Sequence, residues 1–448
     1  MQNSTPRKRI LMISTHGYVQ AEPVLGKPDT GGQVVYVLEL SKCLARMGYQ
    51  VDVLTRQFED LPAEEPVADC VRILRFPCGS NSFIPKETLC DEIPEWIDHA
   101  SQWLRGVQGE VLFINSHYWD AGLAGAGLAH RFNIAHVHTP HSLGVWKRDS
   151  MPGTSQEKES RYNFQRRIGE ETAIYLGADL VVATTTQQHE LLTAPEYGVD
   201  PDSIVEIPPG YDDTRFFPVS PATRYLLKGD LGLRGRVVLA LGRIARNKGY
   251  DLMIRSMPPV LERFADAQLV LAIGAPDPSP DEVRMLTELQ SLAAELGIAE
   301  RVVFHDFIPG EQLADYYRAA DVFALSSRYE PFGMTAIEAM ACGTPTVITT
   351  EGGLWHYVQW GVEAIYANPN DPEAYGHSLC DVLAFPEVAA QLAENGARRA
   401  RGSFTWTAVT QKFLNEASAA VEHRRSTVAR SLGVPGPRKS TKRAPTAV

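Results

Sequence analysis

Short runs of Val, Ile and Leu recur along the chain, each followed by a longer stretch with apolar residues at helical spacing. The runs predict strands that are covered on both faces, because such strands are apolar throughout instead of alternating. They cover residues 10–14, 51–54, 71–76, 111–115, 136–139 and 180–183, and then 237–241, 269–273, 302–304, 322–325 and 346–348. Strands that alternate with helices indicate parallel sheets.

The alternation stops at Pro208, Pro209 and Gly210 and then begins again, which is typical of a domain boundary. We therefore predict an α/β chain of two Rossmann-like, doubly wound domains, residues 1–215 and 216–400. Ligands of such sheets bind beyond the carboxyl ends of the strands. If both domains present those ends to one cleft, the functional residues should lie in loops just after strands.

The chain beyond residue 400 differs from both domains. Phe404, Trp406, Val409 and Phe413 share one helical face, so residues 401–423 are predicted to form a helix that packs back on the N-terminal domain. Residues 424–448 contain seven basic residues and no acidic one. This composition is typical of a solvated, disordered tail, and contact with an anionic surface is the alternative.

Composition narrows the class of protein. The chain has 448 residues, 44% of them hydrophobic, and a mean hydropathy of -0.18. This is enough apolar material for folded cores, and no apolar run is long enough to predict a membrane span. The net charge of -11 argues against nucleic-acid binding. Six cysteines without metal-binding spacing, and an N-terminus unlike a signal peptide, predict reduced thiols and a cytoplasmic location.

Two loops after predicted strands have features of anion-binding sites. The first contains Gly31, Gly32 and Gln33, where a helix is predicted to start. Its bare backbone and free amide groups suit a phosphate, while an ordinary strand-to-helix turn explains the pattern equally well. The second loop contains Arg243 and Lys248, two cations that can converge on a diphosphate. Solvated surface charges are the alternative there.

The third motif is the most specific and follows the strand predicted at residues 322–325. Glu330 and Glu338 are separated by seven residues, among them Phe332, Gly333 and Met334. The glycine leaves backbone amides open at a predicted helix start. Carboxylates at this spacing can bind hydroxyls of a sugar and of a ribose. Two glutamates at this spacing are frequent by chance, but the surrounding PFG and ACGTP sequences argue against coincidence.

The pair Glu330 and Glu338 resembles the E-x7-E signature of retaining glycosyltransferases with the GT-B fold. Arg243 and Lys248 resemble the diphosphate-binding cations of that family. The stretches PDTGGQVVYVLELSKCLARMGYQVDVLTRQ, NSHYWDAG and HTPHSLG are similar to its sucrose synthase and sucrose-phosphate synthase branch. The resemblance spans about residues 9–410, and it implies a GT-B fold and a hexosyltransferase.

The resemblance also implies a role for each matching residue. His141 should lie beside the transferred sugar, and Arg243 and Lys248 should stabilise the leaving diphosphate. Because these cations stabilise the charge and the diphosphate can take the acceptor proton, no metal or other cofactor is required, and stimulation by a divalent cation is compatible with this scheme. The other implied contacts are Gly32 and Gln33 between diphosphate and acceptor, Glu330 with the backbone of Phe332, Gly333 and Met334 at the sugar hydroxyls, Thr335 at the diphosphate, Glu338 at the ribose, and Phe307 beside the base.

A phosphorylated acceptor needs cations of its own, and an arginine fork suits phosphate through two hydrogen bonds. Lys86 and the pair Arg166 and Arg167 match branch members whose acceptor is phosphorylated. For Arg148 a solvated surface charge is an equally good explanation. The predicted acceptor-binding residues are Gln33, Lys86, Tyr118, Lys147, Arg166 and Arg167.

Within the branch, HGYVQAEPVLGKPDTGG, RFPCG, NSHYWDAGLAG, PPGYDDTRFFPVS and NKGYDL most resemble the mannosylfructose-phosphate synthases. That resemblance implies transfer of mannose from GDP-mannose to fructose 6-phosphate, so the partners are a nucleotide sugar and a sugar phosphate. The alternative is sucrose-phosphate synthase, with UDP-glucose or another glucose nucleotide as donor. A sugar-nucleotide-binding protein without catalysis is an alternative of another class, and the intact motifs argue against it.

Other patterns have structural explanations. His136 and His138 share a strand face with His141 beyond them, but no cysteine or carboxylate completes a zinc site, so no metal site is predicted. Asp212 and Asp213 resemble metal-binding aspartates, yet they stand where turn residues are common. The aromatic residues that follow the last predicted strand are expected in the core; they are Trp355, Tyr357 and Trp360.

Overall fold

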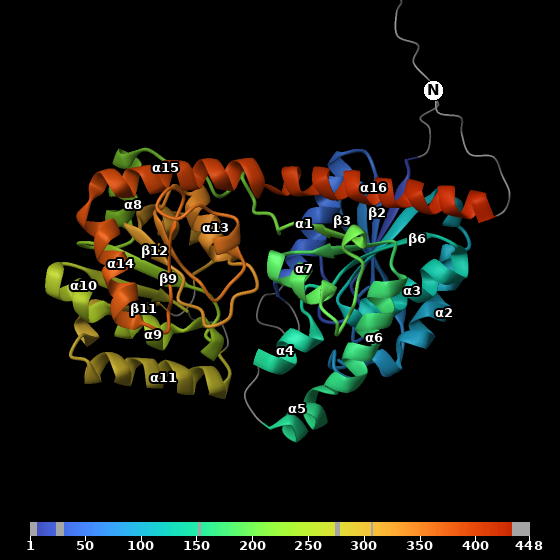
Figure 1. The fold of residues 1–448 in the computed structure, drawn as a ribbon, viewed down its shortest axis with the longest axis horizontal. Coiled ribbons are helices and arrows are strands. Elements are labelled where there is room, and N and C mark those ends of the chain that lie inside the picture. The colour runs from blue at the N-terminus through green and yellow to red at the C-terminus, as the bar shows by residue number, and fades with distance from the viewer. Residues whose placement is uncertain (1–6, 24–30, 151–153, 274–277, 306–307, 432–448) are drawn as a thin grey trace, which may run out of the picture.

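The computed structural model describes residues 7–23, 31–150, 154–273, 278–305 and 308–431. The chain forms two α/β lobes that lie side by side (Figure 1). Helices α15 (Pro386–Ser403) and α16 (Trp406–Ser431) follow one another along the same side of both lobes. Each lobe is built on its own sheet, which confirms the prediction of two α/β domains.

The N-terminal domain contains an eight-stranded sheet in the order β3-β4-β2-β1-β5-β6-β7-β8. Neighbouring strands are parallel except β3 and β4. The strands are β1 (Arg9–Ile13), β2 (Gln50–Gln57), β3 (Glu64–Ala68), β4 (Val71–Pro77), β5 (Val111–His117), β6 (Ala135–Thr139), β7 (Leu180–Ala183) and β8 (Ile204–Glu206). The sequence pattern misses β3, a charged antiparallel edge strand, and β8, which is too short to show a pattern.

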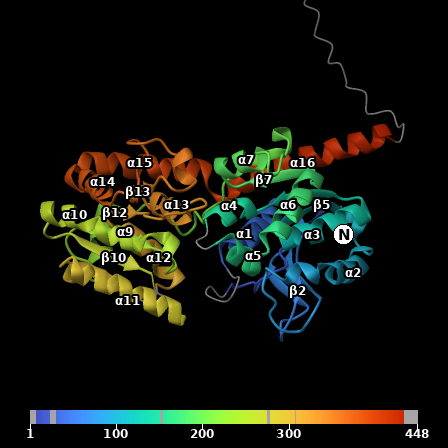
Figure 2. The ribbon, with the colours of Figure 1, turned by 60° about the horizontal axis from the view of Figure 1, so that its bottom comes forward.

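Helices cover both faces of this sheet. α1 (Gly32–Arg46) and α16 share a core with one face, where Val37 and Phe413 are buried. α2 (Ile93–Leu104) and α3 (Trp119–Phe132) share a core with the other face, around Trp96 and Leu128. In Figures 1 and 2, α4 and α7 lie on the side of this domain that faces the second lobe. The remaining helices are α4 (Gly144–Ser150), α5 (Ser155–Tyr162), α6 (Phe164–Gly177) and α7 (Thr186–Thr193).

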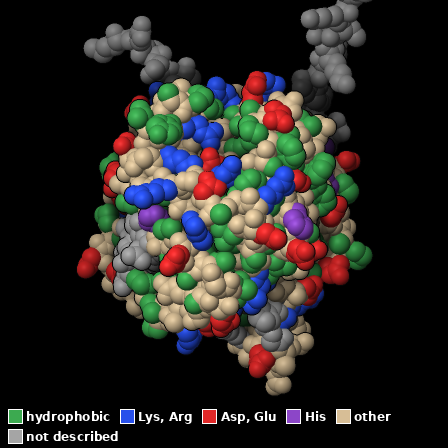
Figure 3. Space-filling model, turned by 90° about the vertical axis from the view of Figure 1, so that its left-hand side faces the viewer, with side chains coloured by type: hydrophobic (Ala, Val, Ile, Leu, Met, Phe, Trp, Pro, Cys, Tyr) green, Lys and Arg blue, Asp and Glu red, His purple; other side chains and the backbone are tan. Residues whose placement is uncertain are grey.

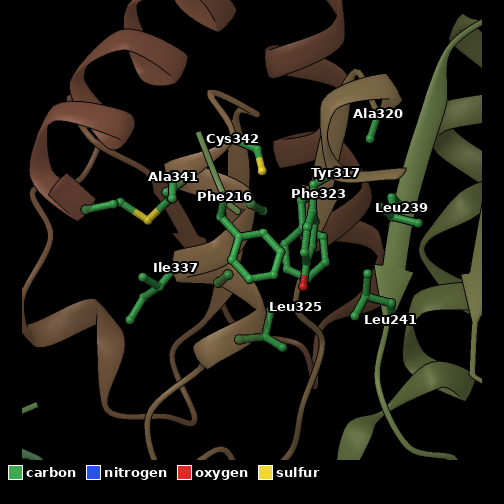
Figure 4. Close-up of a cluster of buried hydrophobic side chains, with 14 of the residues drawn as sticks. Phe216, Leu239, Leu241, Tyr317, Ala320, Phe323, Leu325, Ile337, Ala341 and Cys342 are labelled. Carbon is green, nitrogen blue, oxygen red and sulfur yellow. The ribbon is translucent and has the colours of Figure 1, made fainter. Parts of the chain in front are cut away.

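The C-terminal domain contains a six-stranded parallel sheet in the order β11-β10-β9-β12-β13-β14. The strands are β9 (Val237–Leu241), β10 (Gln268–Ala272), β11 (Val302–His305), β12 (Val322–Ala324), β13 (Thr346–Thr349) and β14 (Ile365–Ala367). The helices are α8 (Pro221–Asp230), α9 (Tyr250–Arg255), α10 (Met257–Arg263), α11 (Pro280–Glu295), α12 (Leu313–Ala319), α13 (Met334–Ala341) and α14 (Pro372–Ala384). Figure 4 shows the core between the sheet, α12 and α13, where Phe216 packs beside Tyr317 and Phe323. α9, α10, α11 and α14 cover the other face.

The chain crosses between the domains twice, at adjacent positions. The Tyr211 amide donates to the Phe404 carbonyl at 2.8 Å, and the Trp406 amide donates to the Tyr211 carbonyl at 3.3 Å. Gly210 has no room for a side chain, because a Cβ atom there would lie 2.6 Å from Trp406 Cδ2. The first crossing therefore lies at the Pro-Pro-Gly segment, and the two crossing segments are hydrogen-bonded to each other.

The end of the chain corrects one expectation. α16 packs on the N-terminal domain through Trp406 and Phe413, and it continues to Ser431. The prediction of a disordered segment from residue 424 onward is therefore wrong for residues 424–431. The helix is held there by Arg424, which lies 3.1 Å from Asp179 and 3.0 Å from Asn133 Oδ1. Residues 432–448 lie outside the described residues.

The surface of the C-terminal lobe mixes both signs of charge. Figure 3 shows Lys and Arg side chains interspersed with Asp and Glu over the end of the molecule formed by this lobe. Within the part of the chain that the structure describes, no helix combines the length and the apolar character that crossing a bilayer requires.

Candidate active site

A lysine and a glutamate from two loops meet beyond the carboxyl end of the C-terminal sheet. Lys248 belongs to the short turn after β9, and Glu330 follows β12. Lys248 Nζ lies 2.6 Å from Glu330 Oε2, which also accepts a hydrogen bond from Ser327 Oγ at 3.0 Å. Two of the predicted catalytic residues are therefore in contact. Sequence reasoning missed Ser327, although it lies only three residues before Glu330.

The loop that contains Glu330 is fixed through its backbone. The Glu330 amide donates to the Glu351 carbonyl at 3.0 Å, and the Gly353 amide donates to the Glu330 carbonyl at 3.1 Å. Gly352 approaches so closely that a Cβ atom there would lie 2.8 Å from the Glu330 carbonyl oxygen. The carboxylate is thus presented by a preorganised loop, which is what electrostatic catalysis requires.

Arg243 lies in the same loop as Lys248 but is exposed, whereas Lys248 is half-buried. Burial raises the pKa of the Tyr250 phenol, Glu330 adds to this effect and Arg243 opposes it, so both charges act on one hydroxyl. The Tyr250 hydroxyl is buried and has no hydrogen-bond partner among the described residues. Two cations and this hydroxyl therefore lie around the loop after β9, an arrangement that suits a diphosphate.

Helix α13 begins beside this cluster. Its N-cap is Gly333, with φ of +108°, a conformation that favours glycine. The first-turn amides, including those of Met334 and Thr335, have no acceptor within the helix and suit an anion. The Phe332 side chain is buried, with its ring 5.6 Å from that of Tyr357. Phe332 can therefore reach a ligand only through its backbone, the role that the family resemblance implies.

Glu338 lies within α13 and its side chain is half-buried. Its Oε2 atom accepts a hydrogen bond from the Tyr317 hydroxyl at 2.8 Å. Burial raises the pKa of Glu338 to about 7, while Tyr317 and Arg215 act in the opposite direction. The carboxylate therefore changes its charge near neutral pH. Phe307, the residue predicted beside the base, lies outside the described residues.

In the N-terminal domain, Gln33 and His141 are linked through His117. Gln33 Nε2 lies 3.2 Å from the His117 carbonyl oxygen, and His117 Nδ1 lies 2.9 Å from His141 Nε2. Burial lowers the pKa of His141 to about 3 and also lowers that of His117. At neutral pH His141 is therefore uncharged and can share a hydrogen bond with a sugar hydroxyl. Gly32 is exposed at the start of α1.

Sequence reasoning missed a second polar group in this domain. His16 Nδ1 lies 2.9 Å from Asp120 Oδ1, and Thr15 Oγ1 donates to Asp120 Oδ2 at 2.5 Å. The His16 ring meets Tyr118 edge-to-face, with the ring centroids 4.8 Å apart. A signal was available, because Thr15 and His16 come directly after the strand predicted at residues 10–14. The group lies next to Tyr118, a predicted acceptor residue.

Arg167 is held in a buried network. Its Nε atom lies 2.7 Å from Glu171 Oε1, and one of its terminal nitrogens donates to the Ser142 carbonyl at 2.8 Å. Its guanidinium also lies 4.8 Å from the centre of the Tyr118 ring. Glu171 additionally accepts from the Tyr197 hydroxyl at 2.5 Å. Arg167 therefore belongs to the framework beside Tyr118.

The other predicted acceptor cations lie near carboxylates at the surface. Arg166 lies 2.6 Å from Asp91, and both side chains are exposed. Lys147 lies 3.8 Å from Glu87, and its ammonium lies 4.7 Å from the Tyr162 ring centre. Lys86 adjoins Glu87 in the chain and is half-buried. Arg148 pairs with its neighbour Asp149 at 2.7 Å, which agrees with a solvated surface charge.

The remaining candidate residues have structural partners. Ser116 Oγ lies 2.7 Å from His136 Nε2 and 2.8 Å from His138 Nδ1, so these histidines form a buried hydrogen-bond network. No cluster of three His, Cys, Asp or Glu residues suited to a metal ion occurs among the described residues. Asp212 caps a turn by accepting from the Thr214 amide at 3.0 Å. Trp360 is 58% exposed, so its prediction as a core residue is wrong; it forms an isolated β-bridge with Ala364 across the turn at residues 361–363.

A pocket of about 280 Å³ lies between α9 and α11, behind the loop that contains Lys248. Its lining includes Ile244, Tyr250, Met285 and Leu289, and the Arg246 and Glu288 side chains lie at its edge. Apart from Tyr250, it involves none of the groups that surround Lys248 and Glu330. The polar clusters described above, and not this pocket, therefore define the candidate active site.

Comparison with known families agrees with the two-domain organisation of the chain. The family model of "Glycosyl transferases group 1" matches residues 228–399, that of "Glycosyltransferase Family 4" matches residues 30–215, and that of "Sucrose synthase first GT-B domain" matches residues 6–53. The mannosylfructose-phosphate synthase of Agrobacterium fabrum is 48% identical over 410 residues, which cover 91% of this chain and 90% of that protein. The chain belongs to the group 1 glycosyltransferases of GT-B fold.

Further relatives support this assignment. The D-inositol 3-phosphate glycosyltransferase of Xylanimonas cellulosilytica is 34% identical, with 93% of this glycosyltransferase and 98% of that protein covered. The solved structure of sucrose-phosphate synthase from Thermosynechococcus elongatus superposes with a TM-score of 0.79 at 29% identity, covering 94% of this chain and 100% of that one. The predicted fold class and enzyme class are confirmed.

Proposed function

We propose that this glycosyltransferase transfers mannose from GDP-mannose to fructose 6-phosphate, with retention at the sugar carbon, and forms mannosylfructose 6-phosphate. The observation that carries the proposal is the contact between the rings of Trp146 and Tyr329, which are the chain neighbours of Lys147 in one domain and of Glu330 in the other. Glu330 pairs with Lys248, which shares its loop with Arg243. The cations of this loop suit a diphosphate, and Lys147 and Arg166 of the N-terminal domain suit a sugar phosphate. The identity of 48% with a mannosylfructose-phosphate synthase supports this choice of substrates.

The geometry fits the chemistry of such a transfer. The bond between sugar C1 and the diphosphate oxygen breaks, the acceptor hydroxyl oxygen bonds to C1, and its proton passes to the diphosphate. Lys248, Arg243 and the first-turn amides of α13 stabilise the negative charge that grows on the leaving group. His141, uncharged at neutral pH, orients a hydroxyl of the transferred sugar. No step of this scheme requires a metal, so activity is expected to persist in a chelator such as EDTA.

Sucrose-phosphate synthase is the alternative function, with a glucose nucleotide as donor and the same acceptor. The structural likeness to the Thermosynechococcus elongatus enzyme favours it, because that TM-score of 0.79 extends over 94% of the chain. The acceptor side of the site serves both functions equally. The donor sugar and base therefore distinguish them.

The test is nucleotide release from GDP-mannose and UDP-glucose, each with and without fructose 6-phosphate, together with mass analysis of the product. Release from GDP-mannose that depends on fructose 6-phosphate supports the proposal. Release from UDP-glucose alone favours sucrose-phosphate synthase, and the absence of release from every donor in a wider panel of nucleotide sugars favours a binding protein. In the same assay, Lys86→Ala and Arg166→Ala should mainly raise the KM for the sugar phosphate, and an unchanged KM in both variants contradicts the phosphate site.

We also propose that the reaction takes place in the cytoplasm. All six cysteines have free thiols, and five of them are buried. Free thiols are usual in the reducing environment of that compartment.

A further inference from the structure

One aromatic pair joins the two domains beside the active site. The rings of Trp146 and Tyr329 lie with their centroids 4.6 Å apart at an interplanar angle of 76°. Trp146 belongs to α4, the helix that also contains Lys147, and Tyr329 is the residue immediately before Glu330. Both side chains are half-buried. An edge-to-face contact at this distance is attractive, so the pair holds an acceptor-side helix against a donor-side loop.

On the donor side, Tyr329 is tied to the loop that contains Lys248. The Asn247 side-chain amide donates to the Tyr329 carbonyl at 3.1 Å, and the Arg328 amide donates to the Asn247 carbonyl at 2.8 Å. The Arg328 guanidinium also lies 2.6 Å from Asp251 at the start of α9. The Tyr329 ring therefore projects from a segment that is hydrogen-bonded to the loop of Lys248 and is adjacent to Glu330.

On the acceptor side, the start of α4 is fixed to the network around Arg167. The Gly144 amide donates to Glu171 Oε2 at 2.8 Å, and the Val145 amide donates to the Tyr197 hydroxyl at 3.1 Å. Glu171 is itself paired with Arg167. The Trp146 ring therefore projects from a segment that is hydrogen-bonded to the network of Arg167, a predicted acceptor residue.

The charges that act on Tyr329 agree with a position between the two domains. Burial raises the pKa of the Tyr329 phenol, Glu330 raises it further, and Arg167 of the other domain lowers it. A carboxylate of the donor side and a guanidinium of the acceptor side therefore both act electrostatically on this phenol. The pair thus lies where the two halves of the site meet.

We infer that Trp146 and Tyr329 are positioning residues that hold the two domains at the separation required for glycosyl transfer and keep water from the reacting carbon. The inference rests on the proposed transfer but not on the identity of the sugar. Transfer and hydrolysis make the same bond changes at C1: the bond to the diphosphate oxygen breaks, and either the acceptor oxygen or a water oxygen replaces it, its proton passing to the diphosphate. The domain separation decides which oxygen reaches C1.

The experiment compares Trp146→Leu, Tyr329→Leu, their double variant and Trp146→Phe with the unaltered chain. Nucleotide release and disaccharide formation are measured together from GDP-mannose and, in parallel, UDP-glucose, each with fructose 6-phosphate. The excess of release over disaccharide gives the hydrolysed share. We expect this share to rise about 2- to 12-fold in each leucine variant. Loss of an edge-to-face aromatic pair should shift the equilibrium between the two domain positions by about that factor. The double variant should match the single variants, and Trp146→Phe should restore most of the coupling.

Trp103→Leu is the matched control, because Trp103 packs against Phe76 within the N-terminal domain at a centroid distance of 6.0 Å. It reports general destabilisation and should leave the hydrolysed share unchanged. Small-angle X-ray scattering without substrates gives a second readout, in which Trp146→Leu and Tyr329→Leu should show a larger radius of gyration than the control. This readout stands even where neither donor releases nucleotide, a result that would overturn the proposed function alone. A hydrolysed share and a radius of gyration equal to those of the control, or additive effects in the double variant, would overturn the inference.

Discussion

The proposed donor and acceptor sides of the site differ in how their cations are paired. On the donor side, Lys248 pairs with Glu330 while Arg243 is exposed to receive an anion. On the acceptor side, cations already face carboxylates: Arg167 faces Glu171, Arg166 faces Asp91, and Lys147 faces Glu87. Under the proposed function, a diphosphate can therefore bind to Arg243 directly, whereas a sugar phosphate has to replace Asp91 or Glu87 at its cations.

Burial separates the acceptor arginines further. The Arg167 and Glu171 side chains are 4% and 0% exposed, whereas those of Arg166 and Asp91 are 38% and 60% exposed. A buried ion pair is costly to break, and an exposed one contributes little. Of these two adjacent arginines, Arg166 is thus the better candidate for binding a phosphate, and Arg167 has a structural role.

The largest expected effect concerns the donor side. Lys248→Ala should lower kcat by about 100- to 1,000-fold, the range seen when one preorganised transition-state contact is removed. Arg246→Ala is the matched control, because Arg246 lies in the same turn but is exposed and paired with Glu288 at 3.2 Å. Steady-state kinetics with saturating donor and acceptor measure both. Equal losses in the two variants would show that the loop needs only general positive charge.

The two acceptor arginines should differ in stability. Arg167→Leu leaves Glu171 buried without its partner and should lower the free energy of unfolding by about 3–5 kcal/mol. Arg166→Leu breaks an exposed pair and should lower it by less than about 1 kcal/mol. Denaturant unfolding followed by circular dichroism measures both. Similar losses would contradict the assignment of Arg167 to the framework.

The donor side should also respond to pH through Glu338. Its pKa is raised to about 7 by burial, and the ionised form is the better acceptor for ribose hydroxyls. Nucleotide affinity should therefore fall as the pH drops through about 7, by up to about tenfold between pH 8 and pH 6, because one proton is taken up. The same raised pKa means that the folded state keeps a proton which the unfolded chain loses, so Glu338 lowers stability as the pH rises from about 4.5 to about 7.

Titration calorimetry of guanosine, which carries the ribose but no titrating phosphate, tests the binding part at both pH values. The variant Glu338→Gln should lose the pH dependence and bind with one affinity throughout. The acceptor side gives the contrast, since the KM for fructose 6-phosphate should not follow the same curve. A pH dependence that survives in Glu338→Gln assigns the titration to another group.

The smallest effect is expected from freeing Arg166. Asp91→Asn removes the charge that competes with the acceptor phosphate and should lower the KM for fructose 6-phosphate by up to about fivefold, the size of an exposed ion pair. Asp98→Asn is a suitable control, because Asp98 forms a different exposed ion pair, with Arg131 at 2.8 Å. A higher KM in Asp91→Asn would mean that Asp91 orients Arg166 for binding and does not compete with the phosphate.

Local signals predicted most of the strands and some of the contacts around the candidate site. Lys248 and Glu330 both lie in loops after strands, as predicted, and they meet because the carboxyl ends of parallel strands lie at one edge of a sheet. Glu171 could have been found, since it stands four residues after Arg167 on one helix. Asp91 could not, because 75 residues separate it from Arg166 and nothing in either segment specifies the contact.

The same reason explains the error at the end of the chain. Residues 424–431 have the composition of a tail, yet they continue α16 because Arg424 reaches Asp179, a contact over 245 residues. Charge composition describes a segment in isolation. The partner that holds the segment in place is specified elsewhere in the chain.

The central claim is that Arg166 recognises the acceptor phosphate and Lys248 acts on the donor. It is tested most directly by the selectivity for fructose 6-phosphate over fructose. The ratio of kcat/KM for the two acceptors is measured in the unaltered chain, in Arg166→Ala and in Lys248→Ala. The unaltered chain should strongly prefer the phosphate, and Arg166→Ala should lose much of that preference. Lys248→Ala should slow both acceptors and leave the ratio unchanged. A ratio that survives in Arg166→Ala, or one that changes in Lys248→Ala, would contradict the account.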